Sequence, residues 1–541
     1  MLNVLNRVSD QLMARKWLVL VGYMLVSLLC YFSVLDGDFL FDDEHFIQKN
    51  KYIHDLNISK IYTTSVTEGA EIKGNFYRPN QQFIFGLLYQ IVGEETALPY
   101  HLIGIFLHGF NAYLFFLILF ELNKRNTFIV LLSPLLFLIH PIQSEAVAYI
   151  SGLADPLVGF FILLGIRSFQ KLIRFNGKHA YLWLFAAIFC QILASFSKEN
   201  NVVITALFVL FALFYNRIEK YKLTTPSFIG LTISIVLSGV FVYAKMTVLD
   251  FTGAGGLTGE NNIYTQKLWV RLATFLNIFP AYLKMFFLPV KLNYEKPYTG
   301  YIDFFTKETI FSYLYLAVWI YSIVKMRKIP FIFLGLTLFN IAMIPYIGII
   351  PLNAMYLEHW MYLPMLGWAL AFIALLSSFK KNLMMPIFIT ALFVLCIYRT
   401  YLRAEEWGDI EKFYLNELKY GDSARICNNL AMYYSDKGND AKAIKFYNKS
   451  IKTNDSFPQP HHNLGNIYWE QGNKEMALSE WYKALQIDPN FIYTWSKVYG
   501  VAASRNPKLA EELYNVIKTL EGGKGTVNRE YVNSVFSRLL K

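Results

Sequence analysis

Two adjacent aspartates, Asp42 and Asp43, follow an apolar stretch that is long enough to cross a membrane. Neighbouring carboxylates repel each other and add nothing to membrane anchoring. We therefore expect one carboxylate to have a raised pKa and the other to be held ionised by a cation or a metal. Such a pair suits a general base that takes the proton of a hydroxyl group. The alternative is an acidic loop that only marks the membrane boundary.

Further polar residues with chemical potential are scattered along the chain. Arg78, in GNFYRPNQQF, could bind a phosphate or could serve as an interfacial anchor. The stretch LIHPIQSEAVAYISGLADPL contains His140, Glu145 and Asp155. Such residues between membrane spans are costly unless they have partners, so they indicate a functional site, a metal site at His140 and Glu145, or a structural polar network.

Two more polar pairs complete the set. SFSKENN contains Lys198 and Glu199, for which a mutual ion pair is the simplest interpretation, and LEHWMYLP contains Glu358 and His359. The chain has no Walker loop, no dinucleotide fingerprint and no Asp-x-Asp signature of nucleotide-sugar enzymes. The motifs therefore offer no competing nucleotide site on the cytoplasmic side.

The elements that must position these residues are membrane helices. Of the 541 residues, 55% are hydrophobic, and runs of apolar residues alternate with short basic clusters. This pattern predicts an all-α, polytopic membrane domain of about eleven transmembrane helices over residues 1–400. The expected spans are 17–35, 100–121, 128–140, 153–168, 180–196, 201–216, 226–246, 310–324, 330–350, 361–378 and 384–400.

The basic residues predict the orientation. The net charge of +11 comes mostly from short loops between spans, which is typical of an orientation signal and not of a nucleic-acid surface. Arg7, Arg15 and Lys16 precede the first span, so we expect a cytoplasmic N-terminus. Alternating spans then put all the candidate residues on the opposite face, and this convergence predicts a site: Asp42, Asp43, Arg78, His140, Glu145, Asp155, Lys198, Glu199, Glu358 and His359.

Two long outer segments follow from this topology, 36–99 and 247–309. The second contains TGAGGLTGENN (252–262), a glycine-rich stretch that we expect to be mobile. It also contains 271–289, where Pro280 and Lys284 disfavour a straight crossing, so a re-entrant or interfacial helix is expected.

The tail, 401–541, has soluble composition and a repeat. Gly438 and Gly472 are 34 residues apart, and the repeats 424–457 and 458–491 match the tetratricopeptide pattern of paired helices. Residues 493–541 are expected to form a divergent third repeat or capping helices. Such an α-solenoid either merely stabilises the tail or, the interpretation we favour, presents a concave peptide-binding surface.

Together these motifs resemble the transmembrane-and-tetratricopeptide-repeat family of protein O-mannosyltransferases, which are GT-C membrane glycosyltransferases. The resemblance covers nearly the whole chain. It rests on FDDEHFI, YRP, HLIGIFLHGFNAYL, HPIQSEAVAYISGLAD, SKEN, LNY, LEHWMYLP and the repeat tail. Asp42 and Asp43 fall where related protein mannosyltransferases have an Asp-Glu pair.

The resemblance implies inverting transfer of a sugar, expected to be mannose, from a polyprenyl-phosphate donor to Ser/Thr hydroxyls on the extracytoplasmic side. Asp42 would be the general base, and Asp43 would orient the acceptor or share a metal with Glu145. A divalent cation (Mg²⁺ or Mn²⁺) or side-chain cations would stabilise the departing lipid phosphate. The residues expected to bind the donor are Arg78, His140, Glu145, Asp155, Lys198, Glu199, Glu358 and His359.

Two positions depart from the family pattern. The usual Gly-Arg-Ala-Asp reads GLAD, with Leu153 in place of a cation, and the usual Glu-Arg reads Glu-His, with His359. Both bear on the identity of the sugar or lipid. The alternatives are sugar transfer to a glycan or lipid, and a non-catalytic membrane scaffold. The composition favours a bacterial inner membrane with the site and repeats periplasmic, and the other candidate is the endoplasmic reticulum with a lumenal site.

Overall fold

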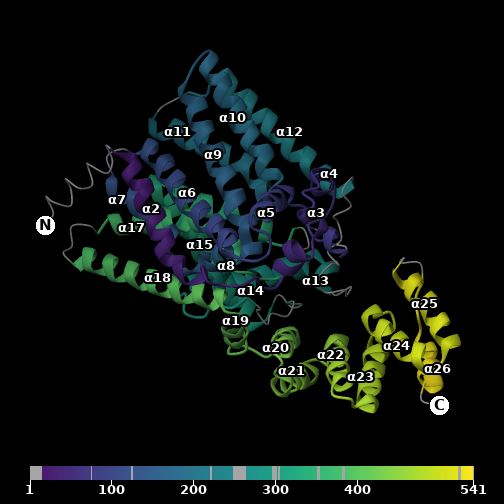
Figure 1. Cartoon of the computed structure of the whole chain (residues 1–541). Coiled ribbons are helices and arrows are strands. Elements are labelled where there is room, and N and C mark those ends of the chain that lie inside the picture. Colours follow the sequence, from purple (N-terminus) through teal and green to yellow (C-terminus); the bar gives the residue numbers. More distant parts are fainter. Residues whose placement is uncertain are drawn as a thin grey trace. The chain divides into compact units, whose positions relative to one another are not determined.

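The structure is a computed structural model that describes residues 15–72, 74, 76–123, 126–219, 222–247, 263–294, 301, 305–349, 352, 354–379, 384–521 and 525–539. These residues form helices, turns and loops with no β-strand, which confirms the predicted all-α class. The chain divides into two compact units, Met1–Asp409 and Ile410–Lys541 (Figure 1). The boundary predicted from the sequence is residue 400, whereas helix α18 continues to Gly408.

The first unit is a bundle of long apolar helices. Within it, α9, α10, α11 and α12 lie side by side (Figure 1). The long helices of this unit are α2 (Lys16–Tyr31), α6 (Leu98–Leu122), α7 (Thr127–Ile139), α9 (Ala154–Arg174), α10 (Lys178–Ser195), α11 (Ile204–Glu219), α12 (Thr225–Thr247), α14 (Leu268–Phe287), α15 (Lys307–Met326), α16 (Pro330–Met343), α17 (Pro364–Ser377) and α18 (Met384–Gly408).

Every predicted span coincides with a helix, but the helices differ in length. In the described part of the chain, 8 helices are long and apolar enough to cross a membrane, or up to 9 if the bent pair Thr127–Ile139 and Pro141–Ala148 is one span. The helices at Pro330–Tyr346 and Pro364–Ser377 are shorter. The chain is therefore a multi-pass membrane protein, and the count of about eleven spans stays a prediction.

Glycines allow the two shorter helices to approach closely. A Cβ atom on Gly367 of α17 would lie 2.3 Å from the backbone nitrogen of Phe339 in α16, and one on Gly335 would lie 2.5 Å from that of Ala371. Small residues at a helix crossing let the backbones pack directly, which is a common device in membrane bundles. Most of the segment 271–289 lies in α14, which ends at Phe287 and contains Pro280. This helix is not among the 8 candidate spans.

The glycine-rich stretch 252–262, expected to be mobile, lies outside the described residues. By contrast, the outer segment 36–99 is largely described. It contains the π-helix η2 (Glu44–Gln48), α3 (Lys51–His54), α4 (Ile58–Thr63), the 3-10 helix η3 (Glu68–Ala70) and α5 (Pro79–Val92).

This outer segment has its own small apolar core. Phe46, Ile47 and Ile53 pack with Phe85 of α5 and Tyr100 of α6. The side chains of two asparagines cap the short helices, by accepting hydrogen bonds from the backbone at the starts of α3 and α4. The core and the caps fix the loop that carries the two aspartates.

The second unit is a solenoid of helical pairs. Its helices are α19 (Ile410–Glu417), α20 (Ala424–Asp436), α21 (Asp440–Thr453), α22 (Pro458–Glu470), α23 (Lys474–Ile487), α24 (Ile492–Arg505), α25 (Pro507–Glu521) and α26 (Arg529–Leu539). Gly438 and Gly472, with φ of 71° and 79°, turn the chain between the helices of the two repeats. Gly465 leaves room for the indole of Trp481.

Helices α24, α25 and α26 occupy the region for which a third repeat or capping helices were predicted. Their buried residues continue the core of the second repeat, because Trp481 and Leu485 of α23 pack with Trp495 of α24 and with Phe536 of α26. The end of the solenoid is thereby covered.

Candidate functional site

One short segment, residues 145–155, contains two of the ten predicted site residues and contacts four others, and we call it the hub segment. It runs from Glu145 in α8 (Ser144–Ala148) through the 3-10 helix η5 (Ile150–Leu153) to the start of α9. It is nearly all buried. The chain folds back on itself at Gly152, where a Cβ atom would lie 2.8 Å from the carbonyl oxygen of Glu145.

Of the two aspartates that precede η2, Asp43 is buried and Asp42 is exposed. Asp43 is 1% exposed: its Oδ2 accepts from the backbone N–H of Leu40 at 2.9 Å, and its Oδ1 accepts from the backbone N–H of Ser151 at 2.8 Å and from the Ser151 hydroxyl. Asp42 is exposed, and its backbone N–H donates to the Tyr149 hydroxyl at 3.0 Å.

This separation matches half of the expectation for the pair. Burial raises the pKa of Asp43 to about 7, against the lowering effect of the Ser151 and Leu40 hydrogen bonds. We also expected a cation or a metal to hold the second carboxylate, that of Asp42. The described residues contain no hydrogen bond or ion pair to this carboxylate. Asp42 therefore presents a solvent-accessible carboxylate.

Glu145 and His359 form the next contact of the hub segment. The fully buried Glu145 accepts from the backbone N–H of His359 at 3.0 Å and from its ring Nδ1 at 2.5 Å. Burial, assisted by the nearby Lys198 charge, lowers the pKa of His359 to about 3, so the imidazole is neutral. With Glu145 ionised, Nδ1 carries the proton and donates it to the carboxylate, which leaves Nε2 as an acceptor.

Asp155, in the first turn of α9, pairs with Lys198. The Lys198 ammonium lies 2.6 Å from Asp155 Oδ2, and both side chains are buried. Burial lowers the pKa of Lys198, and the Asp155 charge opposes that shift. Asp155 Oδ1 is buried and accepts no hydrogen bond from the described residues. The expected ion pair between Lys198 and Glu199 is therefore replaced by a pair with Asp155.

Glu199 instead lies between two other cations. Its Oε2 is 3.6 Å from Nε of Arg78, its Oε1 is 3.9 Å from the ammonium of Lys245, and its Oε1 also accepts from the backbone N–H of Tyr77 at 3.3 Å. Arg78 stacks over the Phe76 ring at 4.7 Å and precedes Pro79, which starts α5. The α5 N-terminus thus fixes a guanidinium beside the Lys198 pair.

Glu358 has a partner that the sequence does not predict. Its Oε1 accepts from the backbone N–H of Asn293 at 2.6 Å, and its Oε2 lies 3.7 Å from Nη2 of Arg403, with both side chains fully buried. The predicted boundary at residue 400 leaves Arg403 in the repeat tail. Thr400, Arg403 and Trp407 are spaced so that they share one face of a helix, and all three are buried in α18. This spacing could have indicated that the helix continues past residue 400.

His140 does not join this group. Its Nε2 donates to the Phe286 carbonyl at 3.0 Å, and its Nδ1 accepts from the backbone N–H of Ile142 at 3.3 Å at the start of the 3-10 helix η4 (Pro141–Gln143). Both ring nitrogens are engaged with the backbone, so His140 fixes the bend after α7. Leu153 likewise packs into the apolar core of the outer segment.

The predicted metal positions do not fit a metal. The two oxygens of Asp43 and the two of Glu145 accept hydrogen bonds from Leu40, Ser151 and His359. In the part of the chain that the structure describes, no three His, Cys, Asp or Glu side chains are grouped closely enough to hold a metal ion.

The hub segment therefore contacts Asp42, Asp43, Lys198 and His359, each at a different residue. The charges of Arg78 and Lys198 also act on His359. The segment LEHWMYLP places Glu358 next in the chain to His359. Chain segments that are far apart in sequence meet here, which is expected of a site held by a rigid bundle.

The chain is similar to protein O-mannosyl-transferases. It is 24% identical to the human protein O-mannosyl-transferase TMTC4 over 78% of this chain and 64% of that protein. It is 25% identical to the Caenorhabditis elegans protein O-mannosyl-transferase F38B6.6 over 82% of this chain and 64% of that protein. A third relative, the human protein O-mannosyl-transferase TMTC3, is 22% identical over 86% of this chain and 54% of that protein.

The chain thus spans less than two thirds of the length of these relatives. Family models described as TPR repeat and tetratricopeptide repeat match residues 433–472 and 458–491. This confirms the predicted repeats in the second unit. No solved structure matches the chain significantly.

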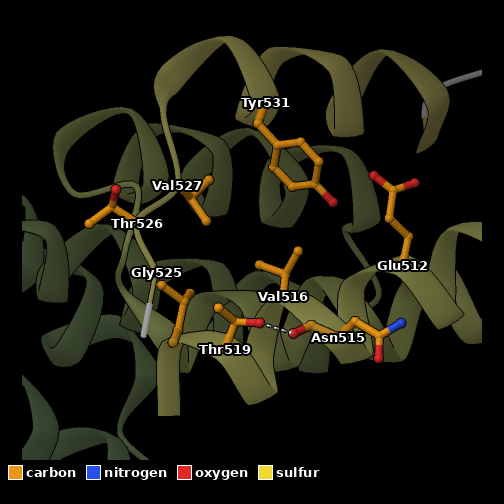
Figure 2. Close-up of a pocket in the computed structure, with 9 residues that line it drawn as sticks. Glu512, Asn515, Val516, Thr519, Gly525, Thr526, Val527 and Tyr531 are labelled. Atoms are coloured by element: carbon orange, nitrogen blue, oxygen red, sulfur yellow. Dashed lines mark hydrogen bonds between the residues drawn. The ribbon is translucent and has the colours of Figure 1, made fainter. Parts of the chain in front are cut away.

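A separate cavity lies within the repeat unit. It has a volume of about 330 Å³. Figure 2 shows Glu512, Val516 and Thr519 of α25 facing Tyr531 of α26 across it, with Gly525, Thr526 and Val527 at one end. None of the predicted site residues lines this cavity.

Proposed function

We propose that this protein transfers a hexose, mannose by resemblance to its relatives, from a polyprenyl-phosphate donor to Ser/Thr hydroxyls of proteins. The observation that carries the proposal is the accessible Asp42 carboxylate, attached through Tyr149 to the same hub segment that holds the Lys198 ammonium. A base for the acceptor and a cation for the leaving phosphate are thereby fixed by one rigid element.

Asp42 is the proposed general base. An exposed carboxylate without an ion-pair partner among the described residues is free to accept the proton of an incoming hydroxyl. The hydroxyl oxygen then bonds to the anomeric carbon in line with the departing phosphate oxygen, whose bond to that carbon breaks. The products are the glycosylated protein and the lipid phosphate, with inverted configuration at the anomeric carbon.

Arg78 and Lys198 are the proposed ligands of the phosphate. Arg78 has further N–H donors besides the Nε that faces Glu199, and a guanidinium can bind two phosphate oxygens at once. Lys198 supplies a buried positive charge whose strength is raised by the low-dielectric surroundings. Asp155 holds this ammonium, and its second oxygen is available to a sugar hydroxyl.

His359 is a proposed hydrogen-bond acceptor for the donor. The neutral ring donates through Nδ1 to Glu145, which leaves Nε2 to accept from a sugar hydroxyl. A positively charged residue at this position would instead attract phosphate. The choice of histidine therefore supports a role in sugar recognition.

The repeat unit is proposed to present acceptor proteins, because tetratricopeptide solenoids commonly bind peptides along a concave surface. The site and the repeats are proposed to be extracytoplasmic, from the basic residues of the inner loops. A bacterial inner membrane and the endoplasmic reticulum remain the two proposed locations.

The decisive experiment uses Asp42→Asn in the full chain. Transfer of labelled mannose from polyprenyl-phosphate mannose to proteins of membranes that lack this chain should fall by at least roughly 100-fold. Thermal stability should be unchanged, because the carboxylate is exposed. The matched control is Asp38→Asn, an exposed aspartate of the same loop. Undiminished transfer by Asp42→Asn would remove the proposed base, and no transfer by the wild-type chain would favour a scaffold.

A further inference from the structure

The loop before Asp42 has an unusual backbone conformation. Phe41 has a φ of 55°, in the left-handed region that non-glycine residues rarely adopt. Such a conformation persists only where the surroundings hold it, and it is frequent at functional sites. In this loop the conformation accompanies the separation of the two carboxylates, with Asp43 turned inward and Asp42 outward.

Tyr149 supplies one of the contacts that hold this turn, and it comes from a distant part of the chain. Its hydroxyl accepts the backbone N–H of Asp42, the residue directly after the left-handed one, at 3.0 Å. Two residues further on, Ser151 donates to the Asp43 carboxylate from both its backbone N–H and its hydroxyl. The hub segment thus binds the backbone of Asp42 through Tyr149 and the side chain of Asp43 through Ser151.

Aromatic packing fixes the Tyr149 ring itself. The ring stacks on Trp407 of α18 at 5.1 Å with an interplanar angle of 20° and meets Tyr294 edge-on at 6.5 Å. Tyr294 also packs against Phe41, with ring centroids 5.1 Å apart. Tyr149, Tyr294 and Trp407, from three distant parts of the chain, therefore pack on one another beside the Phe41–Asp42 turn, and Tyr294 contacts Phe41 directly.

We propose that Tyr149 is a positioning residue, which aims the Asp42 carboxylate at the acceptor hydroxyl by fixing the backbone of the Phe41–Asp42 turn. This inference rests on the proposed function, because it assigns Tyr149 a role through the base Asp42. Burial and the neighbouring Asp42 and Asp43 charges raise the pKa of Tyr149 well above its ordinary value, so the hydroxyl stays protonated.

Tyr149→Phe tests the proposal, because it removes the hydroxyl and keeps the stacked ring. With labelled polyprenyl-phosphate mannose and the membrane proteins described above, we expect kcat to fall by roughly five- to tenfold with the donor KM unchanged. The matched control is Tyr23→Phe. It removes a tyrosine hydroxyl that donates to the Leu131 carbonyl at 2.8 Å, away from the turn, and should leave kcat unchanged.

A double-variant cycle distinguishes the positioning role of Tyr149 from a merely structural one. In an Asp42→Glu background the carboxylate is already displaced, so Tyr149→Phe should cost clearly less than in the wild type. An equal loss in both backgrounds, an unchanged kcat, or a raised donor KM alone would overturn the positioning role. Full activity of Asp42→Asn would instead overturn the proposed function.

A second measurement covers the case in which Tyr149→Phe fails to fold. In the wild-type chain the Asp42 amide should exchange its hydrogen slowly although the Asp42 side chain is exposed, because the amide donates to a buried hydroxyl. Exchange as fast as that of an unprotected loop amide would refute the hydrogen bond on which the proposal depends.

Discussion

The ammonium of Lys198 and the carboxylate of Asp155, 43 residues apart in the chain, are 2.6 Å apart, with their side chains 6% and 2% exposed. Two charges so deeply buried must remain together, because either one alone in a low-dielectric interior is strongly destabilising. The pair therefore fixes the start of α9 to the turn before α11, and it holds a positive charge at the site.

Lys198→Met should destabilise the protein by about 3–5 kcal/mol, because it leaves Asp155 buried without its partner. Thermal unfolding of the full chain in detergent measures this loss. Lys49→Met is the control, since Lys49 forms an exposed pair with Glu44 whose loss should cost less than about 1 kcal/mol.

The double variant Lys198→Met with Asp155→Leu distinguishes structure from function. Replacing a buried pair by apolar residues should restore most of the stability, whereas sugar transfer should stay lost. If the double variant transfers sugar at the wild-type rate, Lys198 has no part in binding the phosphate.

Arg78→Lys should raise the KM for the lipid-phosphate donor by roughly tenfold with a smaller effect on kcat. An ammonium cannot reproduce the two-pronged hydrogen bonding of a guanidinium to a phosphate. Steady-state kinetics with polyprenyl-phosphate mannose provide the measurement. The control is Lys60→Met, at an exposed cation of the same outer segment. A fall in kcat at unchanged KM would contradict the assigned role.

Asp43 should make stability depend on pH. Its pKa is about 7 in the folded protein but about 4 in an unfolded chain, so the folded state binds this proton more tightly. Its contribution to stability is full below pH 4 and is lost as the pH rises through 7, by at most about 1.4 kcal/mol per pH unit.

We expect the melting temperature of the wild type minus that of Asp43→Asn to decrease between pH 5 and pH 8. Asp38→Asn should show no such trend relative to the wild type, since Asp38 is exposed. A difference that stays constant or increases with pH would mean that Asp43 is ionised throughout this range.

Gly152→Ala should lower both stability and transfer. The added methyl group would lie 2.8 Å from the carbonyl oxygen of Glu145 and 3.2 Å from that of Ala146, so the hub segment must shift, at a cost of about 1–3 kcal/mol. Gly22→Ala in α2 is the matched control, because its methyl group would meet no atom within 4 Å. Melting temperatures and transfer rates of the two variants check this, and equal behaviour would show that the hub segment is not tightly packed.

Much of the fold could be predicted because its signals are local. Apolar runs and basic loops identified the positions of the membrane helices, and the spacing of Gly438 and Gly472 identified the repeats. The bend after α7 was harder to predict from the sequence, because it depends on a hydrogen bond that the His140 side chain accepts from the following backbone. The end of α18 was misplaced because its polar last turns resemble soluble sequence.

The candidate residues could be predicted more easily than their partners. Composition singles out Lys198 and Glu199, but which acid faces Lys198 is decided by the packing of α9 against its neighbours. The different environments of Asp42 and Asp43 depend on a single left-handed residue and on Tyr149, neither of which carries a sequence signal. Arg403 was not predicted as a site residue, because the predicted boundary at residue 400 leaves it in the repeat tail.

The concentration of contacts on residues 145–155 has an evolutionary consequence. Each of four residues in this segment, Glu145, Tyr149, Ser151 and Asp155, contacts a different partner, and all four share one short backbone. Few substitutions in the segment should therefore be neutral. Under the proposed function, changes in sugar or lipid preference would fall on the residues that contact this segment. His359, at a position where the family pattern predicts arginine, is one of these contacting residues.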